Sequence, residues 1–401
     1  MRADMTPPTA KQHHGRPEIL PTRQSYITLD EFTLESGTTL INPTISFTFI
    51  GLLNATRDNV ILVCHALSGS ADFADWWASL LNPPKGKPAL DPTKWCIICC
   101  NTLGSPYGSA SPLTYYRDNA TGERRRYGAD FPATTIRDDV RIHKQILDIL
   151  GVRAIHCVIG SSMGGMTALE WPLLFGAEYV RSLVLIATAA RQSAWGAAWA
   201  EAQRCSIRCD PKFRGGDYEL DDPPTAGLAA ARMAALLTYR THQSFEERFG
   251  GRREGLDRKN GCVMGNGVSV LGGAAQTACL ARSYLQYQGS KFNARFDTNC
   301  YLHILDKIDS HDIARGRCPL TDSAAVDDGE AIKMVLSRIL QPTLVVGIPT
   351  DGLYPVCEQY ALYEGIPNAA FAQLRSEDGH DGFLLEAEQM NQLLLLFLGA
   401  Q

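Results

Sequence analysis

The chain contains 401 residues, of which 45% are hydrophobic and 20% are charged. This composition excludes a disordered chain, and the length suits two or three domains or a single α/β fold with an insertion. The 38 basic and 43 acidic side chains give a net charge of −5, which leaves no basic excess to bind a nucleic-acid backbone.

The first 26 residues are polar and rich in proline, and they lack the apolar stretch of a secretory signal. We therefore expect residues 1–26 to form a flexible N-terminal arm. The longest aliphatic run covers 393–398, whereas a membrane-spanning helix needs about 18 apolar residues, so no membrane partner is expected. These features predict a cytoplasmic protein.

Twelve cysteines are present, and several of them lie in apolar runs such as 95–100. A buried thiol behaves as a small hydrophobic group, so a buried strand explains this run. A zinc site would need a second pair of cysteine or histidine residues at zinc-binding spacing, and none follows. We therefore expect reduced cysteines, a reducing compartment and no bound metal.

Short apolar runs alternate with segments of helical periodicity between residues 60 and 190. Gly151 follows one such helical segment and is placed to end it. Continuous apolar strands that alternate with helices indicate a parallel sheet with helices on both faces. The predicted strands cover 60–64, 95–100, 154–159 and 180–188, and the predicted helices cover 135–150 and 166–175.

The pattern changes after about residue 190. Residues 191–336 show no buried-strand pattern and are rich in alanine, arginine, glutamine and charged residues. We predict one α/β core, formed by 27–190 and 337–401, that is interrupted by a helical lid insertion at 191–336. Within these ranges we expect helices at 193–206, 226–247 and 384–398, a glycine-rich mobile loop at 250–273, and strands at 342–347 and 370–374.

A candidate nucleophile lies between a predicted strand and a predicted helix. Residues 160–164 (GSSMG) match the pattern G-x-S-x-G, in which the two glycines allow a tight turn that exposes the serine above the edge of the sheet. An ordinary strand-to-helix turn is the alternative explanation of these five residues. The context favours Ser162 as a nucleophile, whereas Ser161 occupies the variable position.

A nucleophilic serine needs a base and an acid that orients the base, and this type of fold supplies them in the order Ser, Asp or Glu, His. His380 alone among the nine histidines follows the last predicted strand, and Asp351 follows the strand before it. Asp378 matches by type but is too near His380 to come from that earlier strand. For the oxyanion hole we expect the backbone N–H groups of Met163 and Leu67.

Several longer segments carry more specific information than residues 160–164 do. They are 53–59 (LNATRDN), 64–69 (CHALSG), 101–108 (NTLGSPYG), 135–141 (TIRDDVR), 162–166 (SMGGM) and 379–381 (GHD). From about residue 32 to its end, the chain resembles the homoserine O-acetyltransferase family of α/β-hydrolase-fold acyltransferases, its fungal branch in particular. The resemblance implies the α/β-hydrolase fold, acetyl-CoA as co-substrate without a bound cofactor, a small-molecule acceptor alcohol, and a homodimer.

The same resemblance assigns roles to residues outside the triad. Residues 227–240 resemble the helix that binds the acceptor, so Arg232 and Tyr239 would hold the acceptor carboxylate and Asp381 its ammonium group. Arg232 and Tyr239 are seven residues apart and share one helix face. Two segments depart from the family: 45–51 lacks the usual tyrosine and tryptophan, and 189–192 (AARQ) is closer to deacetylcephalosporin C acetyltransferase, a relative with a larger acceptor.

Together these features predict a ping-pong O-acetyltransferase that acts through acetyl-Ser162 on homoserine or a similar hydroxy amino acid. Two alternatives remain at this point. One is an acetyltransferase for an alcohol of fungal secondary metabolism, and the other is a serine esterase that uses water with the same triad. The predicted lid favours transfer over hydrolysis because a covered site excludes water.

Overall fold

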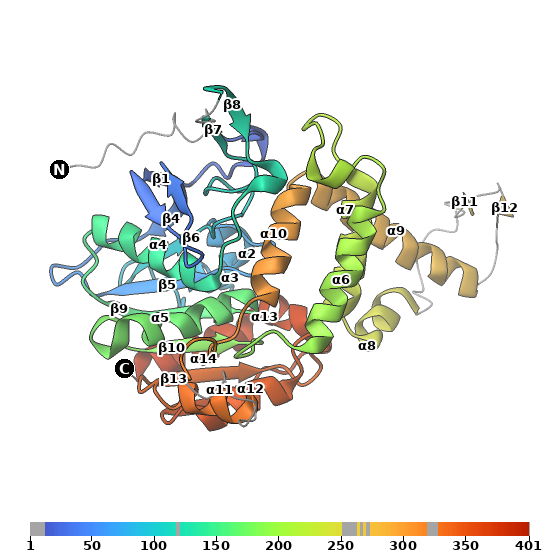
Figure 1. Ribbon diagram of the computed structural model, residues 1–401. Coiled ribbons are helices and arrows are strands. Elements are labelled where there is room, and N and C mark those ends of the chain that lie inside the picture. Colours follow the sequence, from blue (N-terminus) through green and yellow to red (C-terminus); the bar gives the residue numbers. More distant parts are fainter. Residues whose placement is uncertain are drawn as a thin grey trace.

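The computed structural model describes residues 13–117, 121–250, 263–264, 268–269, 273–318 and 328–400. Its central feature is an eight-stranded sheet with the order β1-β4-β6-β5-β9-β10-β13-β14 (Figure 1). The six strands from β6 to β14 in this order run parallel, whereas β4 pairs antiparallel with β6 and the edge strand β1 pairs antiparallel with β4. The sheet strands are β1 (Ser25–Thr28), β4 (Thr44–Ile50), β5 (Val60–Cys64), β6 (Cys96–Cys100), β9 (Ile155–Ser161), β10 (Leu183–Ile186), β13 (Thr343–Gly347) and β14 (Ala369–Gln373). The predicted α/β architecture with a mostly parallel sheet is confirmed.

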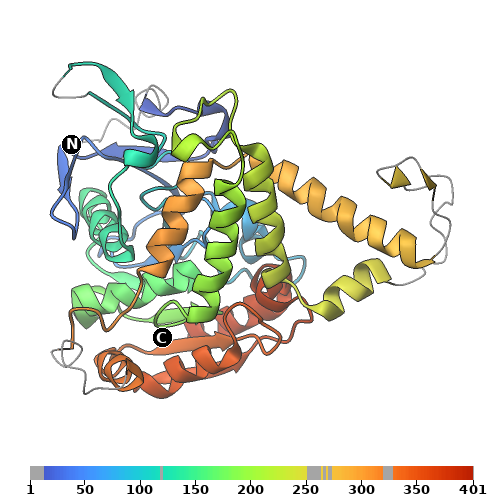
Figure 2. The same ribbon diagram turned by 45° about the vertical axis from the view of Figure 1, so that its right-hand side comes forward.

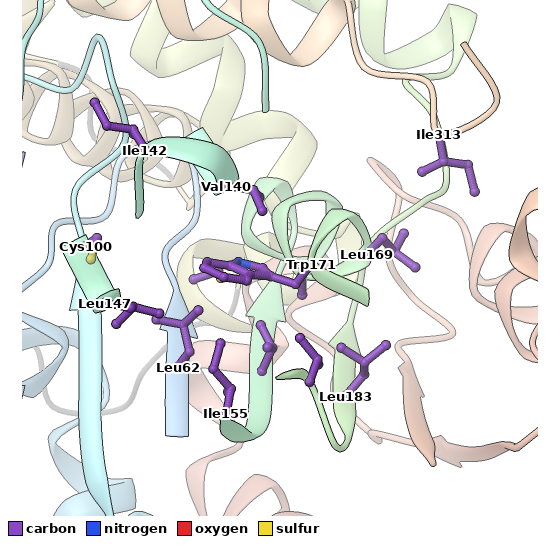
Figure 3. Packing of buried hydrophobic residues seen from close by; sticks show 14 of the residues in the cluster. Leu62, Cys100, Val140, Ile142, Leu147, Ile155, Leu169, Trp171, Leu183 and Ile313 are labelled. Carbon is purple, nitrogen blue, oxygen red and sulfur yellow. The ribbon is translucent and has the colours of Figure 1, made fainter. Parts of the chain in front are cut away.

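Apolar side chains cover both faces of this sheet. In β5, Leu62 belongs to the cluster on one face, whereas Ile61 and Val63 belong to the cluster on the other. Figure 3 shows Trp171 packed against side chains of neighbouring strands, among them Leu62 and Leu183. The helices on the first face are α4 (Ile136–Ile149), α5 (Met163–Tyr179), α11 (Asp328–Leu336) and α12 (Val356–Gly365), and those on the second are α2 (Phe73–Trp76), α3 (Ala78–Leu81), α13 (Gly382–Leu385) and α14 (Ala387–Gly399).

Local sequence signals set the bounds of α4. Thr135 caps its N-terminus by accepting from the backbone N–H of Asp138, and the Asp138 side chain accepts from the N–H of Thr135 in return. The helix ends before Gly151, whose φ of 79° favours glycine. The helix predicted at 135–150 is therefore confirmed.

The expected flexible arm is wrong for residues 13–26, which are docked on the molecule. His14 is buried and donates from Nε2 to the carbonyl oxygen of Pro106 at 2.7 Å. The short helix η1 (Pro17–Ile19) follows, and Ile19 is buried in an apolar cluster near the lid. The expectation rested on the average composition of the segment, which does not show that single side chains bind residues far away in the sequence. Residues 1–12 lie outside the described residues.

Four helices of the predicted insertion cover one end of the sheet, and we call them the lid. They are α6 (Ala194–Arg208), α7 (Thr225–Tyr239), α9 (Gly273–Asn293) and α10 (Thr298–Asp309). The helices α6, α7 and α10 stand side by side, whereas α9 extends away from the sheet (Figures 1 and 2). Tyr301 and Ile304 of α10 pack in one cluster with Met163 at the start of α5, so the lid lies over the carboxyl ends of the strands.

The remaining elements are short. The helix expected at 226–247 is divided, because Arg240 is extended and Thr241 caps the new helix α8 (His242–Phe245). Most of the loop expected at 250–273 lies outside the described residues, which include from it its two end residues, Gly250 and Gly273, and the short strands β11 (Val263–Met264) and β12 (Val268–Ser269). Within the described ranges, no helix combines the length and apolar character of a membrane span. The other elements are β2 (Glu31–Thr33), β3 (Thr39–Ile41), β7 (Tyr115–Arg117), β8 (Arg124–Arg126), η2 (Gly128–Asp130), η3 (Arg214–Gly216), the π-helical turn η4 (Glu246–Gly250) and η5 (Gly379–Asp381).

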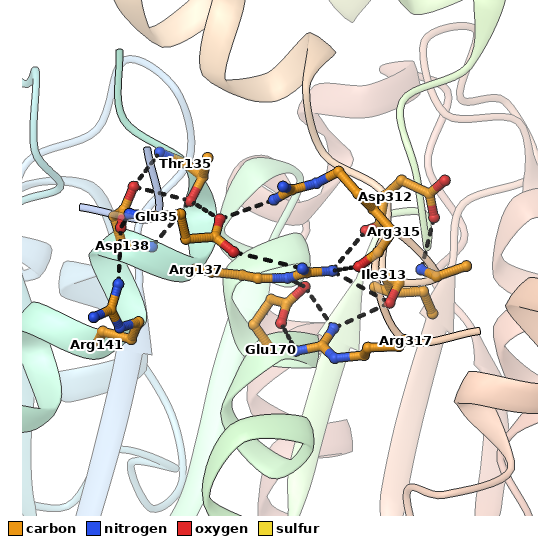
Figure 4. Close-up of polar contacts among 11 residues, drawn as sticks. Glu35, Thr135, Arg137, Asp138, Arg141, Glu170, Asp312, Ile313, Arg315 and Arg317 are labelled. Atoms are coloured by element: carbon orange, nitrogen blue, oxygen red, sulfur yellow. Dashed lines mark hydrogen bonds and ion pairs between the residues drawn. The ribbon is translucent and has the colours of Figure 1, made fainter. Parts of the chain in front are cut away.

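A network of ion pairs fixes the segment that returns from the lid to the core (Figure 4). Arg137 of α4 donates to Glu170 of α5 at 3.1 Å and to the carbonyl oxygen of Arg315 at 2.8 Å. Arg317 also contacts Glu170, which is completely buried. Val335 of α11 belongs to the apolar cluster around Trp171, so the end of the range 191–336 packs against the core.

Candidate active site

Ser162 lies at the junction of β9 and α5, at the carboxyl end of a central strand. Its φ of 56° and ψ of −126° are rare for a residue with a side chain. The neighbouring glycines are required for this turn. A Cβ atom at Gly160 would lie 2.0 Å from the carbonyl oxygen of Gly164, and a Cβ atom at Gly164 would lie 2.0 Å from that of Cys64. Residues 160–164 therefore form a nucleophile elbow.

The side chains of Ser162, His380 and Asp351 form a continuous line of hydrogen bonds. The distance from His380 Nε2 to Ser162 Oγ is 2.9 Å, and that from His380 Nδ1 to Asp351 Oδ2 is 2.7 Å. Asp351 Oδ1 accepts from the backbone N–H groups of Leu353 and Tyr354. Because these two bonds occupy Oδ1, the carboxylate presents Oδ2 to the histidine. The three side chains have the geometry of a nucleophile, a general base and an orienting acid.

The surroundings of His380 suit a base that becomes charged during the reaction. Burial alone would lower the pKa of His380, but the negative charge of Asp351 and its hydrogen bond outweigh burial and raise it. Three aromatic rings, of Tyr239, Tyr354 and Phe383, lie with their centroids 5.5 to 5.8 Å from the imidazole. They restrict the movement of the ring and limit the access of water.

The two expected oxyanion donors follow the carboxyl ends of two neighbouring strands. Met163 is the first residue of α5, and the first N–H groups of a helix have no acceptor within it. Leu67 lies in the turn that follows β5, the parallel neighbour of β9 in the sheet. Both are backbone donors at the carboxyl ends of adjacent strands.

Arg232 and Tyr239 come together on the inner side of α7. The guanidinium carbon of Arg232 lies 5.6 Å from the ring centroid of Tyr239 and 4.8 Å from that of Phe292. Its Nη1 atom is buried and has no hydrogen-bond partner among the described residues. A buried guanidinium nitrogen that lacks an acceptor is an orphaned donor, and an anionic ligand would satisfy it.

Asp381 is engaged with a residue that the sequence analysis did not identify. Arg240 donates from Nε to Asp381 Oδ2 at 2.9 Å, and it also contacts Asp378. Burial raises the pKa of Asp381, although the charges of Arg240, His380 and Arg232 oppose this effect. Arg240 directly follows Tyr239, and that position at the end of the predicted acceptor helix was the one signal that could have identified it.

A nucleophile elbow on a parallel sheet, with the acid and the base on later strand ends, defines an α/β hydrolase. The family model described as alpha/beta hydrolase fold matches residues 59–387. The solved homoserine O-acetyltransferase of Bacillus anthracis shares this fold with a TM-score of 0.75 at 22% identity, over 94% of this chain and 97% of that one.

Sequence comparison narrows the family further. The chain is 48% identical to homoserine O-acetyltransferase FUB5 of Gibberella fujikuroi, over 93% of this chain and 87% of the relative. It is 42% identical to homoserine O-acetyltransferase of Saccharomyces cerevisiae, over 94% and 86% respectively. The chain belongs to the homoserine O-acetyltransferase family, whose members are O-acetyltransferase enzymes.

Proposed function

We propose that this enzyme transfers an acetyl group from acetyl-CoA to the hydroxyl of homoserine, or of a similar hydroxy amino acid, through an acetyl-Ser162 intermediate. The observation that carries the proposal is the position of an orphaned buried guanidinium, Arg232, beside a complete triad. The triad accounts for acyl transfer, and the cation next to it accounts for an acceptor with a carboxylate.

In the first half-reaction, His380 Nε2 takes the proton of Ser162 while Oγ attacks the thioester carbonyl. The oxyanion is bound by the N–H groups of Leu67 and Met163. As the bond between carbon and sulfur breaks, the proton on His380 passes to the leaving thiolate. Acetyl-Ser162 and free CoA are the products.

In the second half-reaction, the acceptor hydroxyl gives its proton to His380 Nε2 and its oxygen attacks the acetyl-enzyme. The bond between the acetyl carbon and Ser162 Oγ then breaks, and the serine takes back the proton. Arg232 and Tyr239 hold the acceptor carboxylate, and Asp381 pairs with the ammonium group. Arg240 keeps Asp381 in place and leaves Oδ1 of Asp381 for the acceptor.

The same triad would serve two other acceptors. A larger alcohol of fungal secondary metabolism is suggested by the sequence at 189–192, and water would make the protein an esterase. The opposite charges of Arg232 and Asp381 favour a small zwitterion over either of these acceptors, because an uncharged acceptor leaves the buried Arg232 Nη1 without an anionic partner.

The nucleophile is tested with intact-mass measurement after incubation with acetyl-CoA. Wild type should gain one acetyl group, and Ser162→Ala should gain none. Ser161→Ala is the matched control, because it removes a neighbouring buried hydroxyl and should still become acetylated. An acetyl adduct on Ser162→Ala would contradict the proposal.

The acceptor is tested by adding homoserine, serine and larger alcohols to the acetylated enzyme and identifying the products by mass spectrometry. We expect homoserine to discharge the enzyme fastest. If the acetyl-enzyme loses its acetyl group at the same rate whether or not an alcohol is added, the protein is an esterase. A preference for a large alcohol would identify the secondary-metabolite enzyme.

A further inference from the structure

The turn after β5 is held from the lid by an arginine that neither the triad nor the acceptor site uses. Arg295 lies in the short connection between α9 and α10. We infer that Arg295 is a positioning residue that couples the docked lid to the orientation of the Leu67 N–H group in the oxyanion hole. This inference rests on the proposed function, since it takes Leu67 as an oxyanion donor.

The first step concerns the peptide group that carries the Leu67 N–H. Its carbonyl oxygen belongs to Ala66 and accepts from the N–H of Gly69 at 2.9 Å and from His65 Nδ1 at 2.8 Å. In a planar trans peptide the N–H points opposite to the C=O. Two bonds that fix the Ala66 oxygen therefore also fix the direction of the Leu67 N–H.

The second step concerns the next fixed peptide group, between Ser68 and Gly69. Its N–H is the donor to Ala66, and its carbonyl oxygen accepts from Arg295 Nη1 at 2.9 Å. The same nitrogen donates to the hydroxyl of Tyr107 at 2.7 Å. Arg295 thus binds the Ser68–Gly69 peptide group, which is hydrogen-bonded through Gly69 to the Ala66–Leu67 peptide group. The Leu67 N–H belongs to the second of these groups.

The core holds the same turn through His65. Its Nε2 accepts from the backbone N–H of Thr102 at 3.2 Å, so Nδ1 carries the hydrogen that is donated to Ala66. Burial lowers the pKa of His65 to about 4, which keeps the ring neutral and preserves this pattern. The turn is therefore fixed from two sides, by His65 of the core and by Arg295 of the lid.

The contact of Arg295 with the lid is firm. Its guanidinium carbon lies 5.2 Å from the ring centroid of Phe292, and the next residue, Phe296, packs edge-on against Tyr107 with centroids 5.8 Å apart. Displacement of the lid would therefore remove Arg295 from Ser68 and leave the turn held from the core side alone. The oxyanion hole is complete only beneath a docked lid.

The test measures acetylation of Ser162 by the release of p-nitrophenolate from p-nitrophenyl acetate, a donor without phosphate groups. In Arg295→Met we expect the acylation rate constant to fall about tenfold to hundredfold with little change in KM, because a displaced oxyanion donor stabilises the transition state poorly. Arg295→Lys should lie between this variant and wild type, since an ammonium group restores donors without the planar fork. Lys291→Ala removes an exposed charge from the same end of α9 and should acylate as wild type does.

The outcomes separate the inference from the function on which it rests. If wild type itself forms no acetyl-enzyme, the proposed function fails. If wild type acylates and Arg295→Met acylates equally fast, the positioning role fails alone. A raised KM for acetyl-CoA with unchanged acylation by p-nitrophenyl acetate would also overturn it, because Arg295 would then bind the donor. Melting temperatures check the fold, and if Arg295→Met is unfolded, a wild-type rate constant in Arg295→Lys overturns the inference.

Discussion

The sheet core and the lid differ in the interactions that hold them. In the core, side chains of central strands such as β5, β6 and β10 alternate between two apolar clusters, and burial of apolar surface supplies the stability. The lid contacts the core through buried charges as well as apolar groups. The difference teaches that the triad is built on the rigid core, whereas Arg232 and Tyr239, which we propose to bind the acceptor carboxylate, lie on a cover that polar contacts hold in position.

One buried ion pair illustrates the contrast. Lys307 of α10 donates from Nζ to Asp139 of α4 at 2.6 Å and to the carbonyl oxygen of Leu103 at 2.7 Å. Both charged side chains are at most 1% exposed. A pair of this kind is costly to form and costlier to break, so it selects one position of α10 over others.

The largest expected effect is the loss of kcat on substitution of Asp351, the triad residue of the core. In Asp351→Asn, the amide oxygen would keep the N–H groups of Leu353 and Tyr354, so the NH₂ group would face His380. The ring would then carry its hydrogen on Nε2 and could not accept the proton of Ser162. We expect kcat for acetyl transfer to fall by about 10³ to 10⁴ with the fold intact. A greater loss from Asp378→Asn would identify Asp378 as the acid instead.

The next effect concerns the stability of the lid contact. Lys307→Met leaves Asp139 buried without its partner, and we expect the free energy of unfolding to fall by about 3–5 kcal/mol in urea titrations. The double variant Lys307→Met with Asp139→Leu should recover most of this loss, because no charge is left unpaired. If the double variant is as unstable as the single one, lost packing rather than the stranded charge explains the result.

A smaller effect separates the two half-reactions. Arg232→Ala should lower kcat/KM for homoserine by roughly tenfold to hundredfold or more, while acetylation of Ser162 by acetyl-CoA continues, because the first half-reaction does not involve the amino acid. Arg208→Ala, at the exposed end of α6, is the matched control and should change neither step. Equal transfer to homoserine by Arg232→Ala and wild type would show that this arginine does not bind the acceptor.

A further expected effect is a dependence of stability on pH that the buried histidines cause. Burial lowers the pKa of His14, His65, His143 and His311 to about 4, below the ordinary value of 6.5. The unfolded chain therefore binds more protons than the folded one below pH 6.5. The free energy of unfolding should fall as the pH drops from 6.5 toward 4, by about 1.4 kcal/mol per pH unit for each such histidine. His14→Gln should show a shallower decline in melting temperature, and an identical slope would exclude His14 as a contributor.

Much of the core could be predicted because its signals are local. The strands of the parallel sheet are short apolar runs, and the elbow at Ser162 is encoded within five residues. The order of strand and helix then places Asp351 and His380 at the correct edge. Each inference needs only the neighbouring sequence and the rule that parallel strands end on one side of the sheet.

The lid could not be predicted in the same detail. Arg240 meets Asp381 across 141 positions of sequence, and Arg295 meets Ser68 across 227, so neither contact has a periodicity that a local pattern could reveal. The docking of residues 13–26 was missed for the same reason. A polar side chain that binds one distant backbone oxygen looks like any exposed polar side chain in the sequence.

The separation of Ser162 from its base along the chain has a consequence for synthesis. The two residues are 218 positions apart, and the base follows β14, the edge strand that is made last. Because synthesis proceeds from the N-terminus, Ser162 is made without its base, which is added only after β14. The triad can therefore form only after β14 has joined the sheet and positioned His380 beside Ser162.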